Sequence, residues 1–324
     1  MFLRTFKQPN GQGTMIWSSP VQQSRIMHLA TLPHTHLAFI VDLERTLKVW
    51  NCQDEDALAT RITPRACFSL EACLTKDGPF LMVSWHSEGD IYTLTVPGLR
   101  NVSKVNVFKY NVDLLHCSPD RKWIFASTHQ HHLPKVFFTA CLLRLAYWAP
   151  RRINRITLMF RRGSSQETGF TTYDLATERT EGRTVIQAHQ ITSFLLPVDM
   201  ESPICMGVSD GNMFVFESRP YLFLFTISGL LLQQFEDHQR TISNLWVDSL
   251  YVLTTSMDDL FYRYMWEEEG RYPYLKSCCH LAHIGSDQIP SCFVSKAICD
   301  NSSIVCVVSR IRESSIPVMY SLNM

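Results

Sequence analysis

The sequence lacks an excess of either charge. Its 324 residues include 30 Lys and Arg against 30 Asp and Glu, so the formal net charge is zero. This balance gives no general electrostatic reason to expect nucleic acid, membranes or acidic proteins as partners. A long hydrophobic run is also lacking, because the longest, residues 221–232, is shorter than the roughly 20 residues that cross a bilayer. We therefore expect no nucleic-acid partner and no membrane.

The first residues lack the apolar core of a signal peptide. The 11 cysteines are odd in number and scattered, and most lie within apolar stretches. Cysteine in such surroundings behaves as a small hydrophobic residue. We therefore expect reduced thiols rather than a disulfide framework, in a soluble protein of the cytoplasm or nucleus.

Helical periodicity is rare, and glycine, with 13 residues, is scarce for a chain with many turns. Short apolar runs recur instead, separated by turn residues such as Lys76-Asp77-Gly78 and Ser118-Pro119-Asp120. The clearest runs are residues 36–42, 80–85, 91–96, 122–127 and 251–256. This pattern predicts an all-β chain of short antiparallel strands.

The strands follow a repeat, whose clearest unit runs from Asp237 and His238 to Trp266 and has an aromatic residue closing its third strand. Residues 46–51 (TLKVWN) resemble the end of a WD repeat, with Asn51 in the place of Asp. Weaker equivalents of the aromatic position are Phe6, Leu94, Phe138, Tyr173, Phe225 and Tyr320. Their mean spacing is close to the roughly 40–45 residues of a propeller blade, although the interval before Tyr173 is short and the next one long.

This spacing predicts one domain, residues 1–324, folded as a WD-repeat-like β-propeller of seven or eight degenerate blades. The start of the chain holds two strand-like segments, residues 2–6 and 14–18, and its end holds residues 317–322. We expect the first blade to lack its inner strands and the last blade its outer strand. A ring that is incomplete at the N-terminus in this way would leave strand edges exposed.

Several segments resemble the propeller of F-box/WD-repeat proteins: residues 13–20, 47–57, 74–83, 89–105, 252–256 and 265–280. In that family an F-box binds the Skp-type adaptor of an SCF ubiquitin ligase, and the propeller presents substrates. The resemblance implies a non-catalytic substrate-recognition module whose partners are protein substrates or peptides. We expect the adaptor and cullin to be reached only through an F-box, which this sequence lacks.

The sequence departs from the family pattern at residues 141–154, which are shorter than expected and fall in the short repeat unit. This shortening puts the integrity of the ring in question. The missing F-box leaves a second interpretation open, in which the chain is a WD-repeat scaffold or a truncated competitor with no ligase link.

One constellation has the order of the hydrogen-bonded tetrad of a WD repeat: His238, Ser256, Asp258 and Trp266, with Trp50 at the matching aromatic position of an earlier unit. A Ser/His/Asp catalytic triad is the alternative. No Gly-x-Ser-x-Gly nucleophile turn supports it, so we interpret these residues as structural and the protein as no enzyme.

Metal and cofactor sites are not predicted. The candidate ligands are Cys278, Cys279, His280 and His283, together with His129, His131 and His132. Adjacent cysteines fit a zinc site poorly because its thiolates are usually spaced by two to four residues. The second histidine group is interpreted as a solvated turn, with a metal or pH-sensitive contact as the alternative. No phosphate-binding loop or dinucleotide motif is present.

The densest local charge is a group of five arginines, Arg151, Arg152, Arg155, Arg161 and Arg162. Charge on an exposed strand edge is the simpler interpretation, because it prevents edge-to-edge pairing. The functional alternative is an anion-binding surface for a phosphorylated or acidic peptide, since arginine offers bidentate hydrogen-bond donors.

Overall fold

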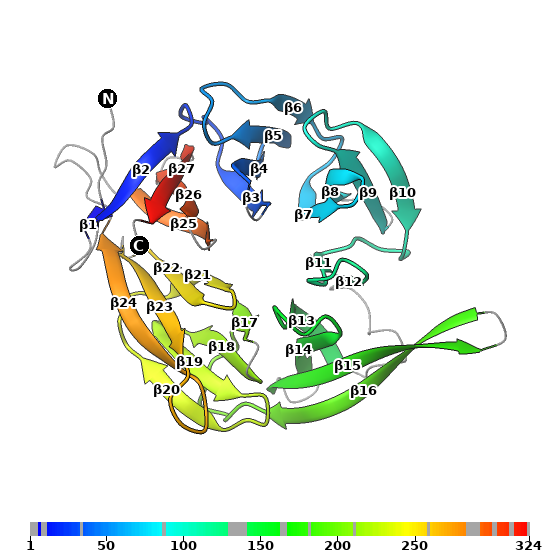
Figure 1. The fold of residues 1–324 in the computed structure, drawn as a ribbon, viewed down its shortest axis with the longest axis vertical. Coiled ribbons are helices and arrows are strands. Elements are labelled where there is room, and N and C mark those ends of the chain that lie inside the picture. The colour runs from blue at the N-terminus through cyan, green and yellow to red at the C-terminus, as the bar shows by residue number, and fades with distance from the viewer. Residues whose placement is uncertain are drawn as a thin grey trace.

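The fold is a ring of antiparallel sheets (Figure 1). In the computed structural model, the described residues are 6–7, 12–32, 35–85, 89–128, 141–162, 167–180, 183–209, 212–257, 260–282, 292–299, 303–310 and 314–322. They form 27 strands in seven sheets, of which six have four or five strands and one has two. The described residues contain no helix that could span a membrane. The predicted all-β propeller is confirmed, with six blades of at least four strands.

Six of the seven sheets are runs of consecutive strands, with the first at the centre of the ring, and the seventh combines strands from both ends of the chain (Figure 1). The first sheet holds β3 (Ile26–Thr31), β4 (Leu37–Asp42), β5 (Thr46–Asn51) and β6 (Ala59–Ile62). The next holds β7 (Cys67–Thr75), β8 (Gly78–Trp85), β9 (Asp90–Thr95) and β10 (Asn101–Asn106). The two-stranded sheet holds β11 (Leu114–Cys117) and β12 (Ile124–Ser127).

The remaining sheets continue round the ring. One holds β13 (Cys141–Trp148), β14 (Arg155–Arg162), β15 (Thr168–Thr180) and β16 (Arg183–Leu195), and the next holds β17 (Met206–Val208), β18 (Met213–Ser218), β19 (Tyr221–Thr226) and β20 (Leu231–Phe235). Then come β21 (Ile242–Val247), β22 (Tyr251–Ser256), β23 (Leu260–Glu267) and β24 (Tyr274–Ala282). The last holds β25 (Cys292–Cys299), β26 (Ser303–Arg310) and β27 (Ser315–Leu322), with β2 (Gln12–Ser18) and β1 (Phe6–Lys7) outside them.

The two ends of the chain meet in this last sheet. Strand β2 pairs with β27 in a register that runs from Gly13 opposite Leu322 to Ser18 opposite Val318. The expectation of two incomplete blades at the ends is therefore wrong, because each end supplies the strands that the other lacks. Pairing of β2 with β27 satisfies backbone groups that an open edge would leave free. Phe6 accordingly lies in the outermost strand rather than at a third-strand aromatic position.

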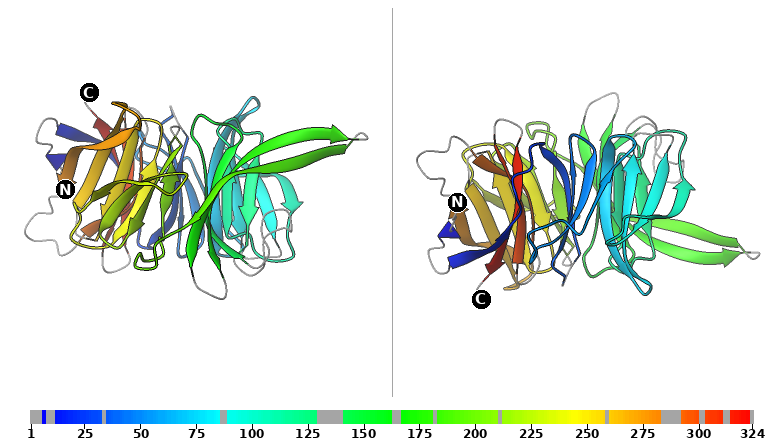
Figure 2. Two further views of the ribbon diagram at one scale, coloured as in Figure 1. Left: turned by 90° about the horizontal axis from the view of Figure 1, so that it is seen from below. Right: turned by 90° about the horizontal axis from the view of Figure 1, so that it is seen from above.

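The predicted third-strand positions are otherwise correct wherever the structure describes them. Trp50, Leu94, Tyr173, Phe225, Trp266 and Tyr320 lie in the third strands β5, β9, β15, β19, β23 and β27, and Phe138 is outside the described residues. The long interval after Tyr173 is explained by β15 and β16, which have 13 residues each and project from the ring as a hairpin (Figure 2). Beyond Asp174, where pairing with β14 ends, this hairpin is a two-stranded ribbon.

Hydrophobic clusters fill all seven interfaces between neighbouring sheets. The densest joins the sheets of β15 and β18, where Phe170, Phe214, Phe216 and Phe225 pack with ring centroids 4.6–6.0 Å apart. The two-stranded sheet is included, since separate clusters join it to β7 on one side and to β13 on the other. The core is therefore continuous round the ring. The shortened segment 141–154 does not break it, because β13 pairs with β14 from Cys141 to Trp148.

Candidate functional site

The centre of the ring contains a cavity of about 500 Å³. It is lined by residues at or near the ends of the innermost strands β3, β7, β11, β13, β21 and β25. A volume of this size is within the roughly 300–1,000 Å³ of ligand-binding pockets. Because strands from six of the sheets contribute to its wall, we take it as the candidate site.

A repeated irregularity shapes the wall of this cavity. The innermost strands β3, β7, β13, β21 and β25 each shift register near their start, immediately before His28, Ser69, Leu145, Asn244 and Lys296. A β-bulge places one extra residue on its strand and re-aims the side chains that follow. These five residues therefore occupy equivalent positions, which we call the belt positions.

Polar side chains at three belt positions bind the next sheet of the ring. His28 Nε2 lies 3.0 Å from the carbonyl oxygen of Cys67. Ser69 accepts a hydrogen bond of 3.1 Å from the backbone N–H of Leu115, and Asn244 Nδ2 donates one of 3.2 Å to the carbonyl of Ala297. The belt therefore joins neighbouring blades through side-chain hydrogen bonds as well as apolar packing.

Lys296 is the belt residue that brings a charge to the cavity. Burial lowers its pKa, and the nearby Arg25 lowers it further. Among the described residues it makes no ion pair with a carboxylate. Trp246 lines the same cavity, and its buried indole N–H has no hydrogen-bond acceptor in the described part of the chain. The cavity thus holds a cation that suits an acidic group of a partner, whereas the Trp246 indole N–H is itself buried.

Glu71 and His116 form a second polar corner of the cavity. Their side chains keep 26% and 30% of their surface exposed, and the His116 Nδ1 to Glu71 Oε2 distance is 3.9 Å. Loss of contact with water raises the pKa of Glu71 to about 8 and lowers the pKa of His116 to about 4. Both side chains therefore favour their neutral forms near pH 7, because a low-dielectric site disfavours charge. This corner offers hydrogen bonds rather than an ion pair.

The described residues of the predicted tetrad form hydrogen bonds with other partners. His238 Nε2 lies 2.8 Å from Thr254 Oγ1, whereas Ser256 donates its hydroxyl hydrogen bond to the carbonyl of Arg240. Thr254 and Ser256 share one face of β22 because side chains alternate along a strand, so spacing alone could not separate them. Asp258 lies outside the described residues.

The aromatic positions of the predicted tetrad also differ from expectation. The indole of Trp266 donates to the carbonyl of Asp248, and it is Tyr264 that lies in the core, with its hydroxyl 2.7 Å from Asp237 Oδ2. Trp50 is buried against Trp17, and its indole N–H has no acceptor among the described residues. These residues brace the blades, and none of them reaches the central cavity.

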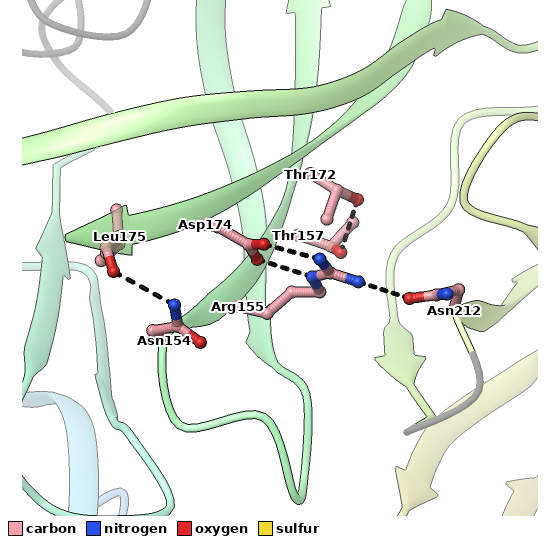
Figure 3. A network of polar contacts seen from close by, with 7 residues as sticks. All are labelled: Asn154, Arg155, Thr157, Thr172, Asp174, Leu175 and Asn212. Carbon is pink, nitrogen blue, oxygen red and sulfur yellow. Dashed lines mark hydrogen bonds and ion pairs between the residues drawn. The ribbon is translucent and has the colours of Figure 1, made fainter.

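The five arginines do not form one surface. Arg155 is buried, with its Nε and Nη2 each 2.6 Å from the Asp174 carboxylate, and it also donates to the side chain of Asn212 in the neighbouring sheet (Figure 3). Its assignment as partner-binding is therefore corrected, because a bidentate pair satisfies its donors inside the ring. Arg151 and Arg152 are exposed, and Arg162 lies 3.6 Å from Glu167.

The candidate metal ligands are only partly placed. Cys278 is exposed on β24. The side chains of Cys279 and His280, as well as His283, His129, His131 and His132, lie outside the described residues. In the described part of the chain, no group of three or more His, Cys, Asp or Glu side chains is arranged to hold a metal ion.

Sequence reasoning missed the residues that line the cavity. Lys296 and Asn244 are polar residues of the innermost strands β25 and β21, and nothing else in the sequence marks them. Their significance depends on the bulge that aligns them, which a single sequence does not reveal. Glu71 and His116 come from different sheets and meet only in the folded ring.

Comparisons with known proteins agree with the fold. No model of a protein family matches the chain. F-box/WD repeat-containing protein 12 of Homo sapiens is 53% identical over 331 residues, covering 96% of this chain and 71% of that protein. F-box/WD repeat-containing protein 15 of Mus musculus is 36% identical over 335 residues, covering 96% of this chain and 70% of that protein.

Among solved structures, Raptor of Chaetomium thermophilum superposes with a TM-score of 0.71 at 10% identity. This chain spans 30% of the length of Raptor, and the likeness shows the fold alone. The family expected from the sequence is confirmed by the two curated relatives. Since the chain aligns over most of the length of both at 53% and 36% identity, it belongs to the family of F-box/WD repeat-containing proteins.

Proposed function

We propose that this chain is a non-catalytic recognition module that presents protein substrates to an SCF-type ubiquitin ligase. The observation that carries this proposal is its similarity, along nearly its whole length, to two F-box/WD repeat-containing proteins. The Skp-type adaptor and the cullin would be reached through an F-box outside the propeller. The module would act in the cytoplasm or the nucleus.

The central cavity is the proposed recognition site. Lys296 provides an unpaired cation on its wall, and Trp246 contributes apolar surface beside it. A protein segment that inserts an acidic group would pair with Lys296, and the apolar lining would bury the rest of the side chain. The exposed Arg151 and Arg152 are a second, peripheral contact for an acidic segment.

We also propose that the two-stranded sheet is a seventh blade. Strands β11 and β12 occupy a place in the ring between β7 and β13 (Figure 1). Apolar clusters pack them against both neighbours, as they do for each larger sheet. A seven-position ring also fits the spacing of the third-strand aromatic residues.

The test is a ubiquitination assay with purified adaptor, cullin and RING subunits. The propeller is fused behind an F-box, and proteins that bind the propeller are supplied as substrates. We expect adaptor binding only with the F-box, and ubiquitination that falls at least tenfold in Lys296→Glu but not in the matched surface variant Lys76→Glu. A fusion that binds adaptor and cullin yet ubiquitinates no bound protein would favour the scaffold or competitor interpretation.

A further inference from the structure

Two thiols face each other where the two-stranded sheet meets the sheet before it. Cys73 lies on β7 and Cys117 on β11, and both line the central cavity. Both are free cysteines in the apolar cluster that also contains Val112 and Leu115. The two side chains are close enough for each to shift the pKa of the other. The fold thus pairs two reduced cysteines that are distant in the sequence and belong to different sheets.

The strands that carry these thiols are held firmly against one another. Ser69 on β7 accepts a hydrogen bond from the backbone N–H of Leu115 on β11. Glu71 on β7 accepts one of 3.3 Å from the backbone N–H of Cys117 itself. These contacts lie beside the thiols and fix the distance between the two strands. A disulfide depends on such fixed proximity because its geometry tolerates little variation.

The surroundings make the two cysteines chemically different. The hydrogen bond from Cys117 lowers the pKa of Cys73, and Arg121 lowers it further against the opposing effect of burial. The same hydrogen bond raises the pKa of Cys117. These opposite directions favour Cys73 as the attacking thiolate and Cys117, the less buried of the two, as the thiol that resolves its oxidised form. By contrast, burial alone raises the pKa of Cys52 to about 12, which keeps that thiol unreactive.

We propose that Cys73 and Cys117 form an oxidative modification site at which a peroxide joins β7 to β11 through a disulfide. The Cys73 thiolate attacks one peroxide oxygen, the O–O bond breaks, and the leaving oxygen takes up the thiol proton to become water. The product is a sulfenic acid on Cys73. The Cys117 sulfur then attacks the Cys73 sulfur, the S–O bond breaks, and a second water leaves with the Cys117 proton. Hydrogen peroxide gains two electrons, and each thiol loses one.

The disulfide would stabilise the smallest sheet of the ring. The two-stranded sheet has the fewest backbone hydrogen bonds of its own, so it depends on its neighbours. A covalent link to β7 would restrict the unfolded chain and hold this sheet in place. It would also alter the corner of the cavity formed by Glu71 and His116, which neighbour the linked residues on the same strands.

The experiment treats the folded full chain with one molar equivalent of hydrogen peroxide, then alkylates the remaining thiols and maps them by mass spectrometry. We expect a cross-linked Cys73–Cys117 peptide, parallel loss of both thiols and full reversal by dithiothreitol. Cys52 and Cys306 serve as buried internal controls and should stay reduced. The proposal is overturned if Cys73 and Cys117 remain thiols after the exposed Cys278 has been oxidised.

Variants separate the two roles. In Cys117→Ser, we expect peroxide to stop at a Cys73 sulfenic acid that a 1,3-dione reagent traps, whereas the control Cys299→Ser should still form the disulfide. In the unmodified sequence, the oxidised chain should unfold at a temperature several degrees above the reduced chain. Failure to trap a sulfenic acid in a folded Cys117→Ser chain, or an unchanged unfolding temperature after cross-linking, would contradict the proposal.

Discussion

The sheets β13–β16 and β21–β24 are both braced by polar networks, but their chemistry differs. In β21–β24, His238 contacts Thr254 and the Tyr264 hydroxyl binds Asp237 within one blade. In β13–β16, the Arg155 guanidinium binds Asp174 and reaches Asn212 of the next blade (Figure 3). The first network stabilises a blade internally, and the second ties two blades together with buried charge. The second should therefore be the more costly to break.

The largest effect is expected for Asp174→Ala, which leaves the buried Arg155 charge without its partner. We expect the free energy of unfolding to fall by about 2 kcal/mol, below the ~3–5 kcal/mol of a deeply buried pair, because Asp174 keeps 29% of its side chain exposed. The loss is measured by equilibrium unfolding in denaturant. The exposed Arg100→Ala is the control and should stay within about 0.5 kcal/mol of the unmodified chain.

The same pair predicts a pH dependence. The hydrogen bonds from Arg155 lower the pKa of Asp174, so the folded state holds this carboxylate ionised more strongly than the unfolded state. The ion pair therefore adds its full contribution to the free energy of unfolding above the unfolded pKa of about 3.9. This contribution is lost as the pH falls through the lowered pKa of the folded state. The stability difference between the unmodified chain and Asp174→Ala should shrink from pH 5 to pH 2. A difference that stays constant would show that the pair is not ionic.

A smaller effect is expected for Tyr264→Phe in the network within one blade. Removing this hydroxyl leaves the Asp237 carboxylate without its 2.7 Å hydrogen bond. We expect a loss of about 1.5 kcal/mol, at the lower end of the range for a hydrogen bond to a charged group. Tyr272→Phe in the same apolar cluster is the control and should change little. Equal losses in both variants would mean that the Tyr264 hydroxyl contributes nothing specific.

The smallest effect is expected for the contact between the His238 ring and the Thr254 hydroxyl. A double-mutant cycle of His238→Phe with Thr254→Val should give a coupling energy of roughly 0.5–1 kcal/mol, because the two side chains are in contact. The parallel cycle with Ser256→Ala should give a coupling near zero, since Ser256 donates to Arg240. A coupling energy that is larger for His238 with Ser256 than for His238 with Thr254 would support the predicted tetrad instead.

These two networks also show what the sequence could reveal. The repeat unit around His238 and the aromatic residues of the third strands follow a linear spacing, so the fold and the blade positions were predictable. Arg155 lies in the same charged stretch as Arg151 and Arg152. Its pairing with Asp174 becomes apparent only when β14 and β15 are placed side by side in the folded sheet. Local composition therefore indicated a surface where the fold places an internal ion pair.

The candidate site was harder to predict, because it is formed by residues from many blades. Glu71 with His116, and Cys73 with Cys117, meet across a sheet interface that no sequence motif spans. The closure of the ring was misjudged for a related reason. The strand patterns at the two ends were recognised, but nothing in either pattern states that β2 and β27 pair with each other.

Closure of the ring is the claim on which the central cavity depends, and hydrogen exchange tests it most directly. Backbone amides of β2 that pair with β27 should exchange as slowly as those of β26, because all belong to one sheet. We predict similar protection factors in β2 and β26 for the isolated chain. Exchange of the β2 amides at the rate of an unfolded peptide, while β25–β27 remain protected, would contradict the closed ring.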